Sequence, residues 1–281
     1  MSYRVLISST DEKGLVYKIS SIFYNYDLNI LSNSEFVDKE KNRFFMRSVV
    51  SGDVNAKELK TKLESIMPEN SDVKVISPKK KNIVILATKE SHALGDILIR
   101  YEAGELDANI LGVVSNYDLL KNLVEKFDIN YKTISHENLS REEHEAQVIE
   151  AIKSYETNDI EIDTIVLAKY MRILTPGFVG TFEDKIVNIH HSFLPAFIGA
   201  NPYKQAFKRG VKIIGATAHF VNNDLDEGPI IAQDVIHVDH TQSWKEMQSA
   251  GRDVEKIVLS RALKLLFEDR LFVYGNKTVV F

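Results

Sequence analysis

Short apolar segments that alternate with helix-like stretches restrict most strongly how this chain can fold. The first apolar segment is Ile-Val-Ile-Leu-Ala at 83–87, and the last two are longer than the others. The segments lie at 83–87, 113–115, 131–134, 164–168, 186–190, 213–221 and 230–238. This alternation is typical of a largely parallel sheet with helices on both faces. After the last strand, Ser243 and Glu246 predict a capping box that begins a long helix.

The residues before this region predict a separate, smaller domain. Strand-like and helix-like patterns follow one another in the order β-α-β-β-α-β, at 3–8, 15–23, 27–36, 44–50, 56–67 and 73–76. This order is that of the ferredoxin-like split unit. Residues 77–81, Ser-Pro-Lys-Lys-Lys, do not suit a packed element. We therefore expect an α/β protein with a ferredoxin-like domain over 1–78 and a Rossmann-like, mostly parallel domain over 82–281.

The composition excludes several classes of protein. A chain of 281 residues with a formal net charge of -5 is long enough for two domains and gives no basic face for nucleic acid. The absence of cysteine excludes disulfides, thiolate metal sites and cysteine nucleophiles. No apolar run approaches the roughly 20 residues of a membrane span, and the first residues predict a strand and not a signal peptide. We therefore expect a cytoplasmic protein that binds neither nucleic acid nor membrane.

Two polar side chains share one face of the strand predicted at 186–190. Asn188 and His190 are two residues apart, and side chains at that spacing point to the same side of a strand. An asparagine amide can donate a hydrogen bond to a developing oxyanion, and a histidine can donate one or move a proton. Taken alone, the pair is equally compatible with a strand end that frays into a loop.

An acidic segment, 222–229, follows the strand predicted at 213–221. Its Asn, Asp, Gly and Pro content also suits a surface turn. Active sites of open α/β sheets lie beyond the carboxyl ends of the strands, where we expect both polar segments. Together they predict an acyl-transfer site with an oxyanion donor, an imidazole and a carboxylate from the Asp-rich segment.

A third segment, 167–176, is a strand end followed by an apolar stretch with a single arginine. It is compatible with plain core and a helix start. The functional alternative is a slot for a flat heterocycle, walled by backbone groups and Met or Leu side chains.

Read in order, these segments resemble the formyltransferases that use 10-formyltetrahydrofolate, over roughly residues 82–281. The resemblance implies that Asn188 and His190 stabilise the oxyanion and that Asp226 manages the proton. It also implies a set of residues that hold the folate pterin: Met171, Arg172, Ile173, Leu174, Val221, Asn222, Asp224 and Leu225.

The first loop of the second domain departs from the members of that family that formylate an amine. They cradle the phosphate of the acceptor with a glycine-rich loop, whereas residues 87–95 lack those glycines and carry Glu90, which would repel a phosphate. Without a phosphate site for an amine substrate, water is the expected acceptor of the formyl group. Formyl transfer to an amine such as glycinamide ribonucleotide stays the alternative.

The whole chain is similar to the formyltetrahydrofolate deformylase family. The segments that carry this similarity are 188–195 with its doubled histidine, 196–200, 225–231, 234–240 and 250–256. The similarity implies hydrolysis of 10-formyltetrahydrofolate to formate and tetrahydrofolate, which would supply formate for purine synthesis and balance the one-carbon folate pools. A non-catalytic folate- or amino-acid-binding regulator is a further alternative, but such a protein would not need Asn188, His190 and Asp226 together.

We expect neither a cofactor nor a metal. A metal site would have to combine Asp226 with some of the histidines His190, His191, His219, His237 and His240. His190 and His191 would face opposite sides if both lay on the strand, and no helical His-Glu-x-x-His signature is present. Because an ordinary aspartate is a weak base at neutral pH, we expect the site to raise the pKa of Asp226.

The turn at 11–16 resembles that of the ACT domain, a small ferredoxin-like module that senses amino acids, as do 29–31 and 43–47. The resemblance implies glycine or methionine as an effector, held by Asp11, Gly14, Leu15, Asn29 and Ile30. Amides exposed at the start of a helix suit a carboxylate. Alternatively, the module only builds an oligomer through sheet pairing. We expect a homo-oligomer because ACT modules usually pair.

Overall fold

The computed structural model describes residues 2–196 and 201–281, so residues 197–200 of the segment 196–200 lie outside the described part. The chain divides into two compact units. The first comprises the residues up to Lys79 together with Asp269–Tyr274 and Val279–Phe281, and the second comprises Lys80–Glu268 and Gly275–Thr278. None of the described helices is long and apolar enough to cross a membrane.

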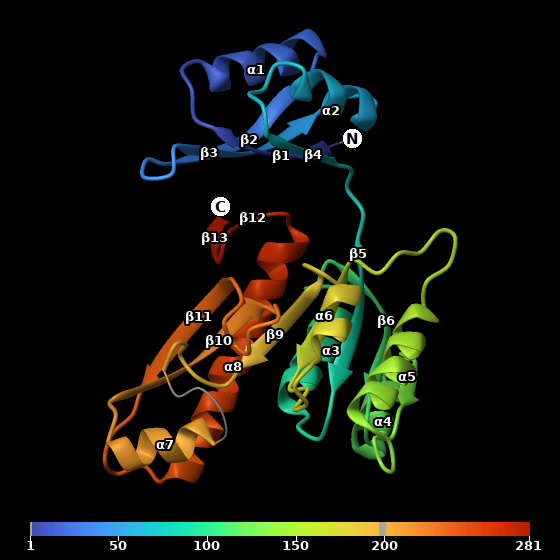
Figure 1. The fold of residues 1–281 in the computed structure, drawn as a ribbon, viewed down its shortest axis with the longest axis vertical. Coiled ribbons are helices and arrows are strands. Elements are labelled where there is room, and N and C mark those ends of the chain that lie inside the picture. The colour runs from blue at the N-terminus through green and yellow to red at the C-terminus, as the bar shows by residue number, and fades with distance from the viewer. Residues whose placement is uncertain (1, 197–200) are drawn as a thin grey trace. The chain divides into compact units, whose positions relative to one another are not determined.

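The first unit is the predicted β-α-β-β-α-β module. Its elements are β1 (Ser2–Thr10), α1 (Leu15–Asn25), β2 (Asn29–Asp38), β3 (Arg43–Ser51), α2 (Ala56–Glu64) and β4 (Asp72–Ile76). The strands form an antiparallel sheet in the order β2-β3-β1-β4, and both helices lie on one face of it (Figure 1). Val5 and Ile7 of β1 point to that face and pack with Ile19 and Phe23 of α1. The ferredoxin-like prediction is confirmed.

The other face of this sheet is apolar too. Leu6 and Phe45 alternate with the residues that face the helices, and they pack with Phe272 of β12 (Leu271–Tyr274), which pairs with β13 (Lys277–Val280). The rings of Phe45 and Phe272 meet edge to face, 5.5 Å between centroids. The sequence pattern places all of 82–281 in the second domain, whereas residues 269–274 and 279–281 group with the first unit because they cover this face.

The second unit is built on a seven-stranded sheet in the order β11-β10-β9-β8-β5-β6-β7. Its elements are β5 (Lys81–Ala87), α3 (His92–Glu102), β6 (Ala108–Ser115), η1 (Asp118–Leu120), α4 (Lys121–Glu125), β7 (Tyr131–Thr133), α5 (Arg141–Lys153), β8 (Thr164–Ala168), α6 (Pro176–Thr181), β9 (Ile186–His190), α7 (Pro202–Arg209), β10 (Ile213–Phe220), β11 (Ile230–His237) and α8 (Trp244–Phe267). Strands β5 to β9 pair in parallel, which confirms the mostly parallel α/β prediction. The capping box of Ser243 and Glu246 at the start of α8 is also confirmed.

Strands β10 and β11 run antiparallel to their neighbours, which changes where the acidic segment leaves the sheet. The last residue of β10, Phe220, pairs with Val187 near the beginning of β9. The sequence pattern predicts that residues 221–229 start at the carboxyl ends of the parallel strands. This prediction is wrong, because the segment starts beside the beginning of β9. The segment returns over the sheet and brings Asp226 to the side chain of His190.

Candidate active site

Four polar side chains meet on strands β9 and β10 and the segment between β10 and β11. Asn188 lies opposite His219 in the strand pairing, so their side chains share a face of the sheet. Asp226 Oδ1 lies 3.3 Å from His190 Nδ1 and 3.8 Å from His219 Nε2. The predicted set of Asn188, His190 and Asp226 is therefore assembled. His219 belongs to it as a fourth member, which the sequence analysis names only as a possible metal ligand.

His219 holds Asn188 in one orientation. Its Nδ1–H donates to the carbonyl of Phe220 over 2.8 Å, which leaves Nε2 as the acceptor for Asn188 Nδ2 at 3.2 Å. Burial lowers the pKa of His219 more than this hydrogen bond raises it, so the ring is neutral at neutral pH. One amide hydrogen of Asn188 is thus engaged, and the second is available to a bound group.

His190 is 5% exposed and contacts Asp226 through Nδ1, which fixes the proton on that nitrogen. Its Nε2 is buried and has no hydrogen-bond partner among the described residues. Burial raises the pKa of Asp226, but the hydrogen bond with His190 and the neighbouring imidazoles outweigh it, and the net pKa lies below its ordinary value. The expectation of a raised pKa is therefore wrong: the charge-stabilising contacts exceed the desolvation of this largely buried carboxylate.

The backbone of residues 221–229 is held tightly. Asp226 adopts a left-handed conformation with φ 58°, which Asp tolerates better than most residues. The amide of Phe220 donates to the carbonyl of Pro229 over 2.9 Å and closes the segment. Gly228 packs so closely that an added Cβ would lie 1.8 Å from the carbonyl oxygen of Phe220. Only glycine fits there, and its fit determines where Asp226 lies.

A cavity of about 490 Å³ adjoins this set, and its wall includes Asn188, His190, His219 and Asp226. Every residue predicted to hold the pterin also lines it: Met171, Arg172, Ile173, Leu174, Val221, Asn222, Asp224 and Leu225. Met171, Ile173 and Leu225 are half or more exposed although they are apolar. Exposed apolar side chains around a cavity with a few polar groups are typical of a ligand site for a flat ring.

His191 lines the same cavity as His190, and the two rings lie 5.1 Å apart. They do not face opposite sides because β9 ends at His190 and the chain turns there. Burial and the charge of Lys169 lower the pKa of His191 to about 4, so its imidazole is neutral at neutral pH. In residues 2–196 and 201–281, no group of three or more His, Asp or Glu residues could hold a metal ion.

The cavity wall also carries a buried network that the sequence analysis did not identify. Glu255 on α8 is 1% exposed and accepts hydrogen bonds from His92 and Tyr203. Burial alone would raise the pKa of Glu255, but His92, the charge of Lys169 and the Tyr203 hydroxyl lower it to about 2. A signal was present: Glu255 lies on the buried stripe of α8, beside Val258, where a charge requires partners.

The first unit has a smaller cavity, of about 280 Å³, at the turn between β1 and α1. Asp11, Gly14 and Leu15 line it, as the predicted effector residues should. Asn29 and Ile30, at the exposed start of β2, are not among its described lining residues. The structure therefore brings together only part of the predicted effector set.

Comparison with known proteins agrees with this architecture. The ACT domain family matches residues 3–66, and the Formyl transferase family matches residues 81–263. A solved glycinamide ribonucleotide transformylase 1 from Symbiobacterium toebii superposes with a TM-score of 0.68 and 26% identity, over 73% of this chain and 96% of that chain.

Other relatives extend over both units. The formyltetrahydrofolate deformylase of Haemophilus influenzae is 55% identical over 276 residues, 98% of this chain and 98% of that protein. A crystal structure of a formyltetrahydrofolate deformylase from Pseudomonas syringae pv. tomato superposes with a TM-score of 0.94 and 39% identity, covering 100% of this chain and 94% of that chain. The resemblance inferred from the sequence is confirmed, and this chain belongs to the formyltetrahydrofolate deformylase family.

Proposed function

We propose that this chain hydrolyses 10-formyltetrahydrofolate to formate and tetrahydrofolate, and that Asn188, His190 and Asp226 carry the reaction. Its place in the deformylase family supports the activity. The observation that supports the residue roles is the contact of 3.3 Å between Asp226 and His190 in the cavity wall, beside the oriented amide of Asn188. The exposed apolar residues Met171, Ile173 and Leu225 would pack on the pterin, with the rest of the predicted set around it.

In the proposed reaction, a water oxygen attacks the formyl carbon and the carbonyl electron pair moves to oxygen. The water gives a proton to His190 Nε2, because Nδ1 is engaged by Asp226 and an imidazole is in general a stronger base than a carboxylate. The ionised Asp226 stabilises the imidazolium that forms. The free amide hydrogen of Asn188, and Nε2–H of the protonated His190, would then donate to the oxyanion.

The second half of the reaction returns the proton. The oxyanion electron pair re-forms the carbonyl, the bond between the formyl carbon and N10 breaks, and N10 takes the proton from His190. Tetrahydrofolate and formic acid result, and the acid ionises to formate in water. No group other than water is required as an acceptor.

The wider role is proposed on the same basis. The formate would feed purine synthesis, in the cytoplasm, and the enzyme would act as a homo-oligomer. Strand β2 supports the oligomer: it is an edge strand with exposed Ile30, Leu31 and Phe36, a surface suited to pairing with a second copy. Glycine or methionine would bind in the cavity lined by Asp11, Gly14 and Leu15. Calorimetric titration with each amino acid tests this, and absence of heat with both would leave only the assembly role.

The activity test is formate release from 10-formyltetrahydrofolate with and without glycinamide ribonucleotide. The wild type should release formate without the amine. Asp226→Asn should lower turnover by on the order of 10²–10⁴ and Asn188→Ala by on the order of 10²–10³. Asp184→Asn is the matched control, since Asp184 shares the φ of 58° but lies outside the cavity wall. Turnover only with the ribonucleotide would make the chain an amine formyltransferase, and an Asn188→Ala variant within about twofold of wild type would refute its role.

A further inference from the structure

The network around Glu255 forms one side of the active-site cavity. Glu255 Oε2 lies 2.8 Å from His92 Nε2 and 3.3 Å from Lys169 Nζ, and Oε1 accepts from the Tyr203 hydroxyl over 2.8 Å. Glu255, Lys169 and Tyr203 are among the residues that line the cavity. These contacts come from α3, the turn after β8, α7 and α8, so a large part of the second unit converges on one carboxylate.

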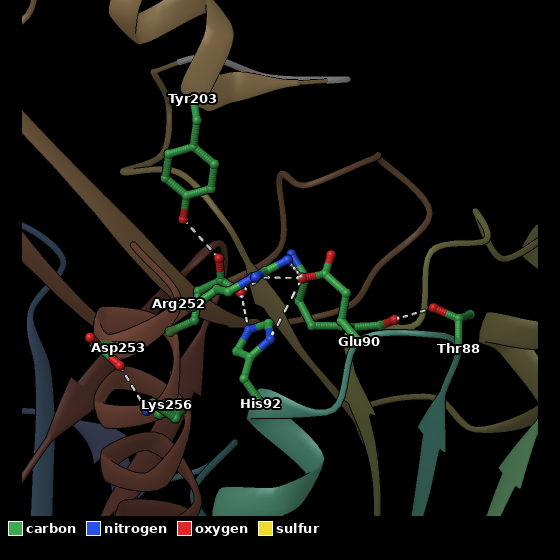
Figure 2. Close-up of polar contacts among 9 residues, drawn as sticks. Thr88, Glu90, His92, Tyr203, Arg252, Asp253 and Lys256 are labelled. Carbon is green, nitrogen blue, oxygen red and sulfur yellow. Dashed lines mark hydrogen bonds and ion pairs between the residues drawn. The ribbon is translucent and has the colours of Figure 1, made fainter. Parts of the chain in front are cut away.

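A second carboxylate joins the network from the turn between β5 and α3. Glu90 Oε2 lies 3.0 Å from both Nε and Nη2 of Arg252 and 3.6 Å from His92 Nδ1 (Figure 2). His92 thus stands between the two carboxylates. Two carboxylates, Glu90 and Glu255, and two cations, Arg252 and Lys169, thus meet in this network.

The backbone of Lys169 is in an unfavourable conformation for its residue type. Its φ is 62°, a left-handed value that costs a residue with a long side chain, and the side chain is only 4% exposed. The Thr88 hydroxyl donates to its carbonyl over 2.7 Å and holds the turn. A glycine would adopt this turn without strain, so the ammonium group at Glu255 accounts for a lysine there.

The same donors would form an anion site if the two carboxylates were absent. The cavity wall offers a guanidinium, an ammonium and a tyrosine hydroxyl, and the His92 imidazole lies behind them on Glu255. Such groups bind phosphate in proteins. Here each of them already contacts Glu90 or Glu255. These donors would therefore not be available to an entering phosphate. The negative charge of the two carboxylates would also repel it, at a place where solvent screens charges poorly.

We propose that Glu90 and Glu255 act as internal anions that close this end of the cavity to phosphorylated acceptors, so that water is left as the nucleophile. The inference rests on the proposed hydrolysis and assigns these two residues as specificity determinants of the same site. Glu90 is the accessible one of the pair, since its side chain is 29% exposed whereas that of Glu255 is 1% exposed. Removing the Glu90 carboxylate should free Arg252 for an external anion, while His92 keeps its contact with Glu255.

The test uses the full chain and compares wild type, Glu90→Gln and Asp234→Asn. Asp234 is the matched control because it pairs with Arg261 of the same helix α8 over 2.9 Å, outside the cavity wall. Inorganic phosphate and glycinamide ribonucleotide are each titrated as inhibitors of formate release. In Glu90→Gln, each should reach half-inhibition at a concentration about tenfold or more below the wild-type value, competitively with the folate or as a mixed inhibitor. Asp234→Asn should match wild type.

Equal inhibition of all three proteins, or an equal gain in both variants, would overturn the proposal. Calorimetric titration with phosphate alone reads the same site without turnover. If wild type releases no formate, the proposed activity fails, while a phosphate site that is present only in Glu90→Gln still supports the internal-anion role. If Glu90→Gln does not fold, as judged by circular dichroism, Glu90→Ser removes the carboxylate with a smaller side chain and the same two readouts apply.

Discussion

Asn188 Nδ2 lies 3.2 Å from Nε2 of His219, the residue directly opposite it on the neighbouring strand. His219 is in turn fixed by its hydrogen bond to the carbonyl of its neighbour Phe220. The amide that would meet the oxyanion is therefore oriented by a neutral, buried imidazole. His219 acts through Asn188 and is a positioning residue.

Replacing His219 should lower turnover more than it affects substrate binding. In His219→Leu the amide of Asn188 loses its acceptor, so we expect kcat to fall by on the order of 10- to 100-fold with little change in KM. His219→Gln retains an acceptor oxygen and should recover part of the loss. Steady-state formate release measures both constants, and a His219→Leu variant with wild-type kcat would contradict the role.

Part of this site could be predicted from the sequence and part could not. The two-residue spacing of Asn188 and His190 fixes their common face as soon as a strand is recognised. The partnership with His219 depends on the antiparallel register of β10 against β9, which no local pattern reveals. Lys169 and Glu255 are far apart in sequence and meet only after folding.

The pKa of Asp226 shows the same limit. A buried carboxylate near apolar residues is expected to titrate high, and the sign reverses only because His190 donates to it and other imidazoles lie close by. The fold was easier to predict, since helix and strand periodicity and the capping box at Ser243 are local signals. The contact of C-terminal residues such as Phe272 with the first sheet joins distant parts of the sequence. The pattern of strands and helices along the chain therefore does not predict it.

Gly228→Ala should strongly lower the rate of hydrolysis while the protein stays folded. The added Cβ would meet the carbonyl of Phe220 at 1.8 Å, so the segment that carries Asp226 must shift. We expect turnover to fall by at least about 100-fold, because small displacements of a reacting group cost this much. Formate release and thermal unfolding give the two readouts.

Gly95→Ala is the matched control for that substitution. Gly95 lies inside α3, where an added Cβ meets nothing within 4 Å, so alanine should raise stability by about 0.5–1 kcal/mol and leave turnover unchanged. Full activity in Gly228→Ala would show that the backbone there does not position Asp226.

Phe272→Ala should destabilise the first unit. The ring is 8% exposed and packs against Phe45 and Leu6 on the sheet face away from the helices. Removing a buried phenyl ring costs about 3–5 kcal/mol. Chemical denaturation followed with a probe in residues 2–79 should show this loss of unfolding free energy. Val273→Ala, at an exposed position of the same strand, is the control and should lower the unfolding free energy far less. If Phe272→Ala and Val273→Ala had equal effects, the C-terminal residues would not contribute to the core of the first unit.

Stability should fall as the pH is lowered from about 6.5 to about 4, and His191 should account for part of the fall. The pKa of His191 in the folded protein is lowered to about 4 from an ordinary value of 6.5, first by burial and then by the charge of Lys169, with Glu255, His190 and Asp226 also facing it. Between these two pH values His191 is protonated in the unfolded chain but not in the folded protein. The free energy of unfolding therefore decreases with falling pH.

The His191 contribution is present in full above about pH 6.5 and is lost by about pH 4, a change on the order of 3 kcal/mol. In His191→Gln the unfolded state has no such proton to gain, so the unfolding free energy should depend less steeply on pH in that window. His240→Gln, at an exposed histidine, is the matched control. Urea denaturation from pH 4 to 7 measures the slopes. Parallel curves for wild type and His191→Gln would mean that the partly buried His191 imidazole is protonated as easily in the folded protein as in the unfolded chain.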